Sequence, residues 1–172
     1  LIDLWNLDKG SRKILTGYAR AKQPLPVFKM PHLRGWSIAG NRAYLPAIGR
    51  HEVLVVDTAT WQEVDRIQVK SQPVFAMARP DGREIWVNFA FPDNGWVQVI
   101  DTVSGKVTDT LQPGRGILHM EFLSKGHEIW LSARDDNKVV IYDTASKQQI
   151  GGFDSASPSG IFFTTRAART GF

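Results

Sequence analysis

The strings VVDT at residues 55–58, VIDT at 99–102 and IYDT at 141–144 repeat along this chain. Their aspartates lie 44 and then 42 residues apart, at Asp57, Asp101 and Asp143. A glycine and, four residues later, an aromatic residue precede each string, as Gly40 with Tyr44, Gly82 with Trp86 and Gly126 with Trp130. A period in the low forties with strand-like content is the sequence signature of a β-propeller, whose blades are four-stranded sheets.

Each repeat divides into four short predicted strands, from an inner strand beside the propeller axis to an outer one. The second repeat predicts strands at 74–79, 84–89, 96–100 and 106–111, rich in β-branched and aromatic residues and bounded by turn residues. The corresponding strands are 35–38, 42–45, 53–56 and 63–69 in the first repeat and 117–122, 128–131, 138–142 and 147–151 in the third. Residues 1–5 and 12–15 predict half of a preceding blade, and 161–165 predict one more inner strand.

The chain is therefore predicted to be all-β and to form part of a single propeller domain. Its blades lie near 1–17, 33–69, 73–111 and 116–152, with a closing strand near 158–166. Three full blades fall short of the roughly four that a closed ring needs, and Leu1 begins inside a predicted strand. Both observations predict a portion of a larger propeller, and the open sheet edges of such a portion favour self-association.

The composition excludes several classes of function. The chain has 172 residues, of which 42% are hydrophobic and 22% charged, as in ordinary soluble globular proteins. Its net charge of +4 is scattered without a basic run, which argues against nucleic-acid binding. The absence of cysteine excludes disulfides and thiolate sites in this segment, and no stretch approaches the ~20 apolar residues that span a bilayer. The four histidines show no i, i+4 pair, so no metal site is predicted.

Repetition separates structural from functional candidates. Asp57, Asp101 and Asp143 are expected to close turns by accepting backbone N–H groups, because aspartate favours this role at turn positions. Trp86 and Trp130 occupy matched positions and are expected to form core between blades. Unrepeated residues in loops are the better candidates for function.

The alternating direction of the strands sorts the loops into two ends. One end gathers the second-to-third-strand loops 46–52, 90–95 and 132–137 and the inter-blade connections 22–34, 70–73, 112–116 and 154–160. Arginines from three blades meet there and could clamp a ligand that carries several carboxylates. The alternative is that they are solvated or pair with Glu52, Asp135 and Asp136. The candidate ligand-binding residues are Trp36, Arg50, Arg115, Gly116, Arg134 and Ser159.

Gly116 and Ser159 are included because small residues let a flat ligand approach the backbone closely. The candidate catalytic residue is His32, in a Pro-His-Leu-Arg-Gly loop that enters an inner strand and aims at the axial channel. Imidazole titrates near neutral pH, so His32 could donate a proton or contact a ligand, and a purely structural role stays open. His119, inside an inner strand, is interpreted as structural, with a channel-facing role as the alternative.

Several loop strings resemble one known family. They are KMPHLRGWSIAG at 29–40, PAIGRHEVLVVDT at 46–58, GRGILHMEF at 114–122, WLSARDDNKVVIYDT at 130–144 and SPSGIFFTTRA at 157–167. They are similar to heme d1 biosynthesis proteins related to the eight-bladed d1 domain of cytochrome cd1 nitrite reductase. The resemblance implies a periplasmic eight-bladed propeller of denitrification that binds heme d1 or a late heme d1 precursor at the loop end.

The resemblance also constrains the chemistry. His32 matches the first of two histidines on the distal side of the heme in the nitrite reductases, whereas the second falls near Ala90. This departure favours a biosynthetic or carrier role over nitrite reduction. For a biosynthetic role, the resemblance implies late tailoring of the macrocycle, by side-chain modification or dehydrogenation. The implied axial ligand lies before Leu1.

Three functional hypotheses follow from the residues and the resemblance together. They are a biosynthetic protein that acts on a bound tetrapyrrole, a non-catalytic heme d1 carrier or protein-interaction propeller, and a nitrite reductase-like enzyme. The implied partners are the tetrapyrrole and other proteins of heme d1 biosynthesis or nitrite reduction.

Overall fold

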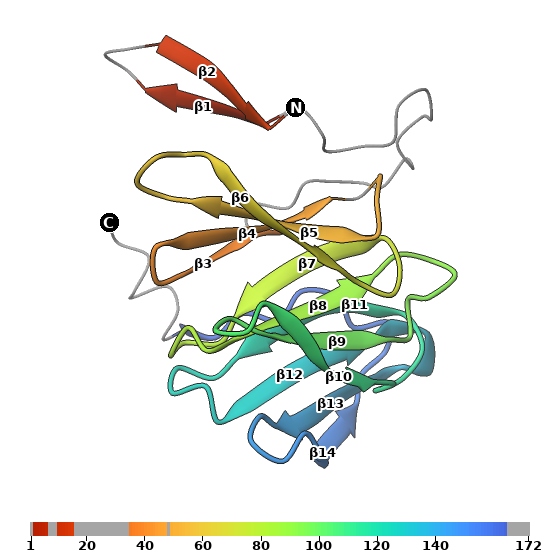
Figure 1. The fold of residues 1–172 in the computed structure, drawn as a ribbon. Helices are drawn as coiled ribbons and strands as arrows, with labels where there is room; N and C mark the ends of the chain where they lie inside the picture. The colour runs from red at the N-terminus through yellow and green to blue at the C-terminus, as the bar shows by residue number, and fades with distance from the viewer. Residues whose placement is uncertain (1, 7–9, 16–34, 48, 165–172) are drawn as a thin grey trace.

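The computed structural model describes residues 2–6, 10–15, 35–47 and 49–164, with side chains from residue 35 onward. This part of the chain forms three four-stranded antiparallel sheets and one two-stranded hairpin. Within each sheet the strands pair in chain order, so every sheet is a meander. The sheets stack face to face with their inner strands in contact, which is how successive propeller blades pack (Figure 1).

The hairpin contains β1 (Ile2–Asn6) and β2 (Gly10–Leu15). The first sheet contains β3 (Ser37–Ala39), β4 (Arg42–Ala47), β5 (Glu52–Asp57) and β6 (Glu63–Gln68). The second contains β7 (Pro73–Ala78), β8 (Glu84–Phe89), β9 (Val97–Asp101) and β10 (Lys106–Leu111). The third contains β11 (Ile117–Phe122), β12 (Glu128–Ala133), β13 (Lys138–Asp143) and β14 (Gln149–Asp154), with the 3-10 turn η1 (Arg134–Asp136) between β12 and β13.

The all-β prediction is confirmed. The inner strand of the first sheet begins at Ser37 rather than at 35, and two further strand predictions need correction. The outer strand of the third sheet begins at Gln149 rather than at 147, because Lys147 has a left-handed φ of 60° and still belongs to the preceding turn. Residues 158–163 form no strand, although a closing strand was expected at 158–166. A strand needs a hydrogen-bonded neighbour, and the described residues supply none for this segment.

The repeated Asp-Thr pair closes the turn between the third and fourth strands of every sheet. Oδ1 of Asp143 accepts hydrogen bonds from the backbone N–H and the hydroxyl of Ser146, both at 2.7 Å. The hydroxyl of Thr144 donates to the Gly126 carbonyl at 2.6 Å, so this turn is tied to the neighbouring β11–β12 turn. Matching contacts join Asp57 to Thr60, Thr58 to Asn41, Asp101 to Ser104 and Thr102 to Gly82.

These turns predict acid-dependent stability. The backbone N–H and hydroxyl of Ser146 lower the pKa of Asp143, and Thr60 and Ser104 lower the pKa of Asp57 and Asp101. A carboxylate whose pKa is lower when folded contributes stability above its unfolded pKa, near 4, and loses it as the pH falls through the folded value. The urea concentration at the unfolding midpoint, measured from pH 7 to pH 3, should therefore decrease once the pH is below about 4.

An Asp143→Asn variant keeps an acceptor oxygen but cannot ionise. It should be less stable than the wild type at pH 7, and its urea midpoint should change less between pH 5 and pH 3. An acid dependence as steep as that of the wild type would show that Asp143 contributes nothing to it.

The core lies between the sheets rather than inside any one of them. Trp86 and Phe75 of the second sheet pack with Met120, Phe122 and Leu131 of the third in one continuous cluster. A second cluster joins residues of the first and second sheets, including Tyr44, Val55, Ile85, Val87 and Phe89. The second sheet is thus buried between the first and the third, and Trp86 forms core between blades as predicted. Trp130 is instead half-buried and contacts the rings of Phe153 and Phe163.

A buried amide links two inner strands close to the loops. Asn88 on β8 is 1% exposed, and its Oδ1 accepts from the Phe75 N–H at 2.9 Å. Its Nδ2 donates to the Ile117 carbonyl, also at 2.9 Å. The pairing of β7 with β8 shifts register between Pro73 and Phe75, so Asn88 satisfies an N–H group that the irregular ladder leaves unpaired.

Candidate functional site

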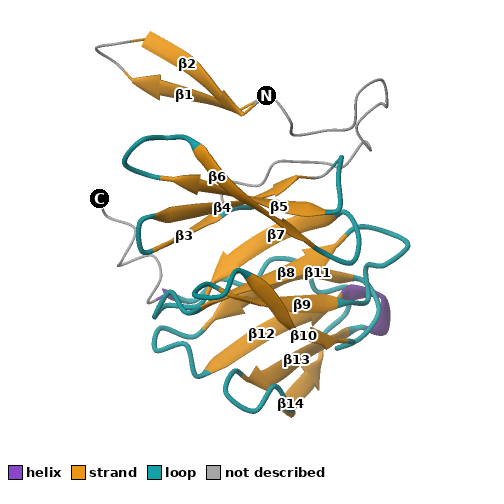
Figure 2. Cartoon of the chain, viewed as in Figure 1, coloured by secondary structure: helices purple, strands orange, loops and turns teal. Residues whose placement is uncertain are grey.

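The loops gather at two opposite ends of the stacked sheets (Figure 2). We define the loop face as the connections β4–β5, β6–β7, β8–β9, β10–β11 and β12–β13, together with residues 155–160. The Asp-Thr turns lie at the other end, as the alternation of strand direction predicted. The loop face therefore contains the described candidates Arg50, Arg115, Gly116, Arg134 and Ser159.

Backbone hydrogen bonds connect these loops both within a sheet and from the second sheet to the third. The Ala90 N–H donates to the Gln72 carbonyl, and the Ile117 N–H donates to the Asn94 carbonyl at 2.7 Å. The Arg134 N–H donates to the Gly116 carbonyl at 3.0 Å. The loops are thus one connected layer over the second and third sheets.

Arg115 is the most firmly held of the three arginines. Its Nε lies 2.6 Å from Asp136 Oδ1, and its backbone N–H donates to Asp136 Oδ2 at 2.7 Å. The Arg115 side chain is nevertheless 78% exposed. The hydrogen bonds from the Arg115 backbone and side chain lower the pKa of Asp136. One of the alternatives considered from the sequence, pairing with Asp136, is therefore realised here.

Gly116 is required by the loop itself. Its φ is +66°, in the left-handed region that favours glycine, and a Cβ there would lie 2.5 Å from Asp135 Oδ2. The space beside Gly116 is thus occupied by a carboxylate of the same chain, whereas the sequence reasoning had reserved it for a flat ligand. Contact between Gly116 and a ligand stays a prediction.

Arg134 lies beside Arg115 in the same layer but is held differently. It begins η1, and its Nη1 donates to the Ser157 carbonyl at 3.1 Å. Among the residues that the structure describes, no acidic side chain forms an ion pair with it. Ser159 is exposed two residues beyond Ser157. Arg134 is therefore a cation of the loop face whose charge no neighbouring carboxylate offsets in the described chain.

Arg50 and Trp36 stand on the first sheet. The Nη1 of Arg50 lies 3.7 Å from Glu52 Oε2, a long ion pair, while Arg66 contacts the same oxygen at 3.1 Å. Partial burial alone would raise the pKa of Glu52, but hydrogen bonds from Gln68 and Arg66 lower it. Trp36, just before β3, is 42% exposed. The structure thus leaves Arg50 loosely held and much of the Trp36 indole accessible.

The two histidine interpretations have different outcomes. His32 lies outside the described residues, so its expected catalytic role stays a prediction. His119 Nδ1 accepts a hydrogen bond from the Ile161 N–H at 3.2 Å, and its ring lies edge-on to Phe75, 5.4 Å between centroids. These contacts support the structural interpretation of His119.

Phe162 is a candidate that the sequence reasoning missed. It is 76% exposed and lies 5.3 Å from the His119 ring, centroid to centroid. It had been placed within the expected strand 161–165, where a large apolar residue is an ordinary core residue. Phe91 on the β8–β9 loop is similarly accessible, at 77% exposure. Both rings offer apolar surface that a flat ligand could cover.

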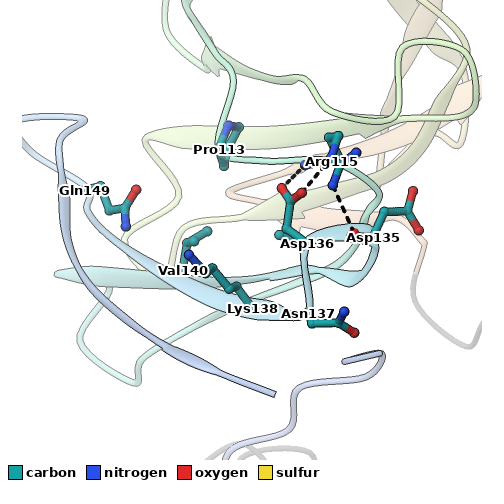
Figure 3. Close-up of a pocket in the computed structure, with 9 residues that line it drawn as sticks. Pro113, Arg115, Asp135, Asp136, Asn137, Lys138, Val140 and Gln149 are labelled. Atoms are coloured by element: carbon teal, nitrogen blue, oxygen red, sulfur yellow. Dashed lines mark hydrogen bonds and ion pairs between the residues drawn. The ribbon is translucent and has the colours of Figure 1, made fainter. Parts of the chain in front are cut away.

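An open cavity of about 410 Å³ lies beside Arg115, between the β10–β11 loop and the third sheet (Figure 3). Charged and polar side chains form most of its wall, with Pro113 and Val140 as apolar patches. Its lining residues are Pro113, Arg115, Ala133, Asp135, Asp136, Asn137, Lys138, Val140 and Gln149. In the described ranges, no three His, Asp or Glu side chains gather closely enough to hold a metal ion.

Comparison with known proteins places the chain in a family. A model of the family described as "Cytochrome D1 heme domain" matches residues 1–167. The chain belongs to the cytochrome D1 heme domain family. It is 50% identical over 170 residues to "Protein NirF" of Pseudomonas aeruginosa and, equally, to that of Stutzerimonas stutzeri. The two matches cover 99% of this chain. They cover 43% and 44% of the two relatives, so the chain spans less than half the length of each.

Solved structures show the fold that this cytochrome D1 heme domain shares. "Dihydro-heme d1 dehydrogenase NirN in complex with DHE" aligns with a TM-score of 0.70 at 23% identity, over 92% of this chain and 34% of that one. Hydrazine synthase of Kuenenia stuttgartiensis aligns with a TM-score of 0.67 at 15% identity, over 80% of this chain and 41% of that one. The TM-scores show a common fold, and at these low identities they show the fold alone. Within the described residues, no helix is long and apolar enough to cross a membrane.

Proposed function

We propose that this member of the cytochrome D1 heme domain family binds heme d1 or a late heme d1 precursor across its loop face during heme d1 biosynthesis. The observation that carries the proposal is the family match over residues 1–167, joined to 50% identity with two NirF proteins. The structure of NirN, a dihydro-heme d1 dehydrogenase that shares this fold, supports the same class of ligand.

The chemistry of the loop face fits such a ligand. A tetrapyrrole with acidic side chains is a flat apolar ring edged by carboxylates, which pair well with guanidinium groups. Arg134 has no acidic partner in the described chain, and most of the Arg115 side chain is exposed. Trp36, Phe91 and Phe162 supply accessible aromatic surface. Heme d1 would contribute the chemistry of its own macrocycle, while the arginines of this chain would orient the acidic side chains of the tetrapyrrole.

The roles of the remaining candidates complete the proposal. Arg50 binds a carboxylate from the first sheet, Gly116 and Ser159 line the ligand's path, and His32 acts as the proton donor. The full-length protein closes an eight-bladed ring in the periplasm of a denitrifying cell. Other proteins of heme d1 biosynthesis or nitrite reduction deliver or accept the ligand, and the isolated chain associates with a second copy.

Absorbance titration of the full-length protein with heme d1 tests the proposal. The wild type should shift the Soret band, and Arg115→Ala with Arg134→Ala should weaken binding about 100-fold or more, since each charged hydrogen bond contributes roughly 1.5–3 kcal/mol. Arg83→Ala is the matched control, because Arg83 is an exposed arginine at the opposite end. An unchanged Soret band with the wild type, or equal affinity in all three proteins, contradicts the proposal.

The same samples separate modification from carriage. After incubation with a late precursor, mass spectrometry of the released tetrapyrrole reports whether its mass has changed. A changed mass that disappears in His32→Ala supports tailoring of the macrocycle, whereas an unaltered tetrapyrrole supports the carrier role.

A further inference from the structure

We propose that Asp136 is a positioning residue, which holds Arg115 so that the outer edge of its guanidinium group faces a carboxylate of the bound tetrapyrrole. The inference rests on the proposed function and assigns a role to a residue that does not itself touch the ligand. It starts from the contacts within one loop pair, β10–β11 and η1, drawn in Figure 3.

Asp136 grips Arg115 at two points with separate oxygens. Oδ2 accepts the Arg115 backbone N–H at 2.7 Å, and Oδ1 lies 2.6 Å from Nε. An exposed ion pair usually contributes little, since a long side chain loses rotamer freedom to form it. Here the backbone contact fixes the carboxylate relative to the Cα of Arg115. Arg115 is then held both at its backbone N–H and at the Nε edge of its guanidinium group.

Asp136 reaches this position because the loop is built to admit it. A Cβ on Gly114 would lie 2.9 Å from Asp136 Oδ2, closer than real contacts allow. The residue after Arg115 is equally constrained, since Gly116 leaves room for Asp135. The loop is also anchored to the second sheet, where Asn94 accepts the Ile117 N–H and Asn88 donates to the Ile117 carbonyl. The base from which Arg115 projects is therefore fixed from both sheets.

The grip leaves most of the guanidinium donors available. Of its five N–H groups, Asp136 engages the one on Nε, and Nη2 makes a long 3.4 Å contact with the Asp135 carbonyl. The Nη1 and outer Nη2 hydrogens form the edge that pairs bidentately with a carboxylate. With 78% of the side chain exposed, this edge is accessible to a ligand. Holding it in one orientation removes part of the entropy cost of binding.

A simple role for Asp136 as a counter-charge makes the opposite forecast. A carboxylate that only neutralises Arg115 should weaken the attraction for an anionic ligand, so its removal should tighten binding. A positioning carboxylate should weaken binding when removed. The two neighbouring aspartates allow this comparison at constant charge, because Asp135 makes no side-chain hydrogen bond to Arg115.

The experiment compares Asp136→Asn with Asp135→Asn in the full-length protein, using coproporphyrin III, a tetrapyrrole with four carboxylates, as the fluorescent probe. Both variants add the same charge. We expect Asp136→Asn to bind the probe about three- to tenfold more weakly than the wild type, and Asp135→Asn to bind it at least as tightly. Arg115→Lys keeps both the cation and Asp136 but lacks the planar fork, and should lose about as much as Asp136→Asn.

The outcomes separate the inference from the function on which it rests. Equal affinity in the two Asn variants, or tighter binding by Asp136→Asn, overturns the positioning role and leaves the proposed function standing. No binding of coproporphyrin III or heme d1 by the wild type overturns both.

A ligand-free readout guards against a variant that misfolds. The Arg115 Nε–H signal in a nitrogen–proton NMR spectrum should be protected and shifted by Asp136 in the wild type. It should persist as the pH falls to the ordinary aspartate range, because the Arg115 contacts lower the pKa of Asp136. An Arg115 signal that exchanges as freely as that of Arg83 overturns the inference.

Discussion

Replacing Trp86 by alanine is expected to lower the free energy of unfolding by about 3–5 kcal/mol, a large share of the stability of an ordinary domain. Trp86 is fully buried between the second and third sheets and meets the Phe122 ring edge-on at 6.1 Å between centroids. Its Nε1 donates to Glu84 Oε2 at 3.0 Å. The substitution removes the ring from the interface and leaves a cavity that the stacked sheets cannot close.

The loss should extend to a charged contact between the same sheets. Lys147 Nζ lies 2.6 Å from Glu84 Oε1 and 5.6 Å from the centre of the Trp86 ring. Without the indole, both the cation–π contact and the support for Glu84 disappear. Trp86→Ala should therefore loosen the junction between the second and third sheets first.

Urea denaturation of the full-length protein, followed by tryptophan fluorescence and circular dichroism, measures the effect. The control is Trp36→Ala, because Trp36 is 42% exposed and its removal opens no cavity of comparable size. The control should change the urea midpoint little and affect ligand binding instead. Similar midpoints for the two variants would show that the interface between the sheets is not the main source of stability.

The isolated 172-residue chain is expected to associate, with light scattering reporting a mass of at least twice 19.3 kDa at micromolar concentration. The third sheet turns one face away from the second sheet. On that face Phe153 is 49% exposed, although its ring contacts Trp130 at 5.7 Å between centroids. Every residue of β14 except Gly151 is exposed. An accessible apolar face beside an unpaired strand edge favours pairing with another chain.

A variant with Phe153→Lys and Ile150→Glu tests which surface is responsible. Ile150 is 55% exposed, so both substitutions place charges on accessible positions and should cost little folding stability. They should shift the mass toward that of one chain. A monomeric wild type would contradict the expectation, and an equally associated variant would place the contact elsewhere.

The repeat explains how much of the fold could be predicted from the sequence. Positions that recur every 42 or 44 residues do the same structural work in each sheet, so Asp101 and Trp86 were interpreted correctly from their spacing. The ends of strands were harder to predict where the adjoining turn contains a residue other than glycine in the left-handed conformation. Lys147, with a φ of 60°, is such a residue, and a lysine side chain does not predict that conformation.

The site was harder to predict because it depends on contacts between loops. The sequence brings Arg115 and Arg134 to one end, but it does not say which carboxylate each will meet. Asp136 pairs with Arg115 across 21 residues because the β10–β11 loop and η1 pack together. Phe162 was missed because the strand rule was extended to a segment without a pairing neighbour. Residues 158–163 form no strand, and the Ile161 N–H donates to His119 Nδ1 on β11 instead of to a neighbouring strand.

The fastening of the Asp-Thr turns has a consequence for how such a protein can change. Every sheet closes itself at one end through its own aspartate and threonine, as Asp143 and Thr144 do, without borrowing a side chain from the opposite end. Mutations can therefore change the loops that carry Arg115 or Arg134 while the strands of the sheets keep their register. A protein built from such sheets can acquire new ligand specificities by exchanging the loops at one end and leaving the turns at the other end unchanged.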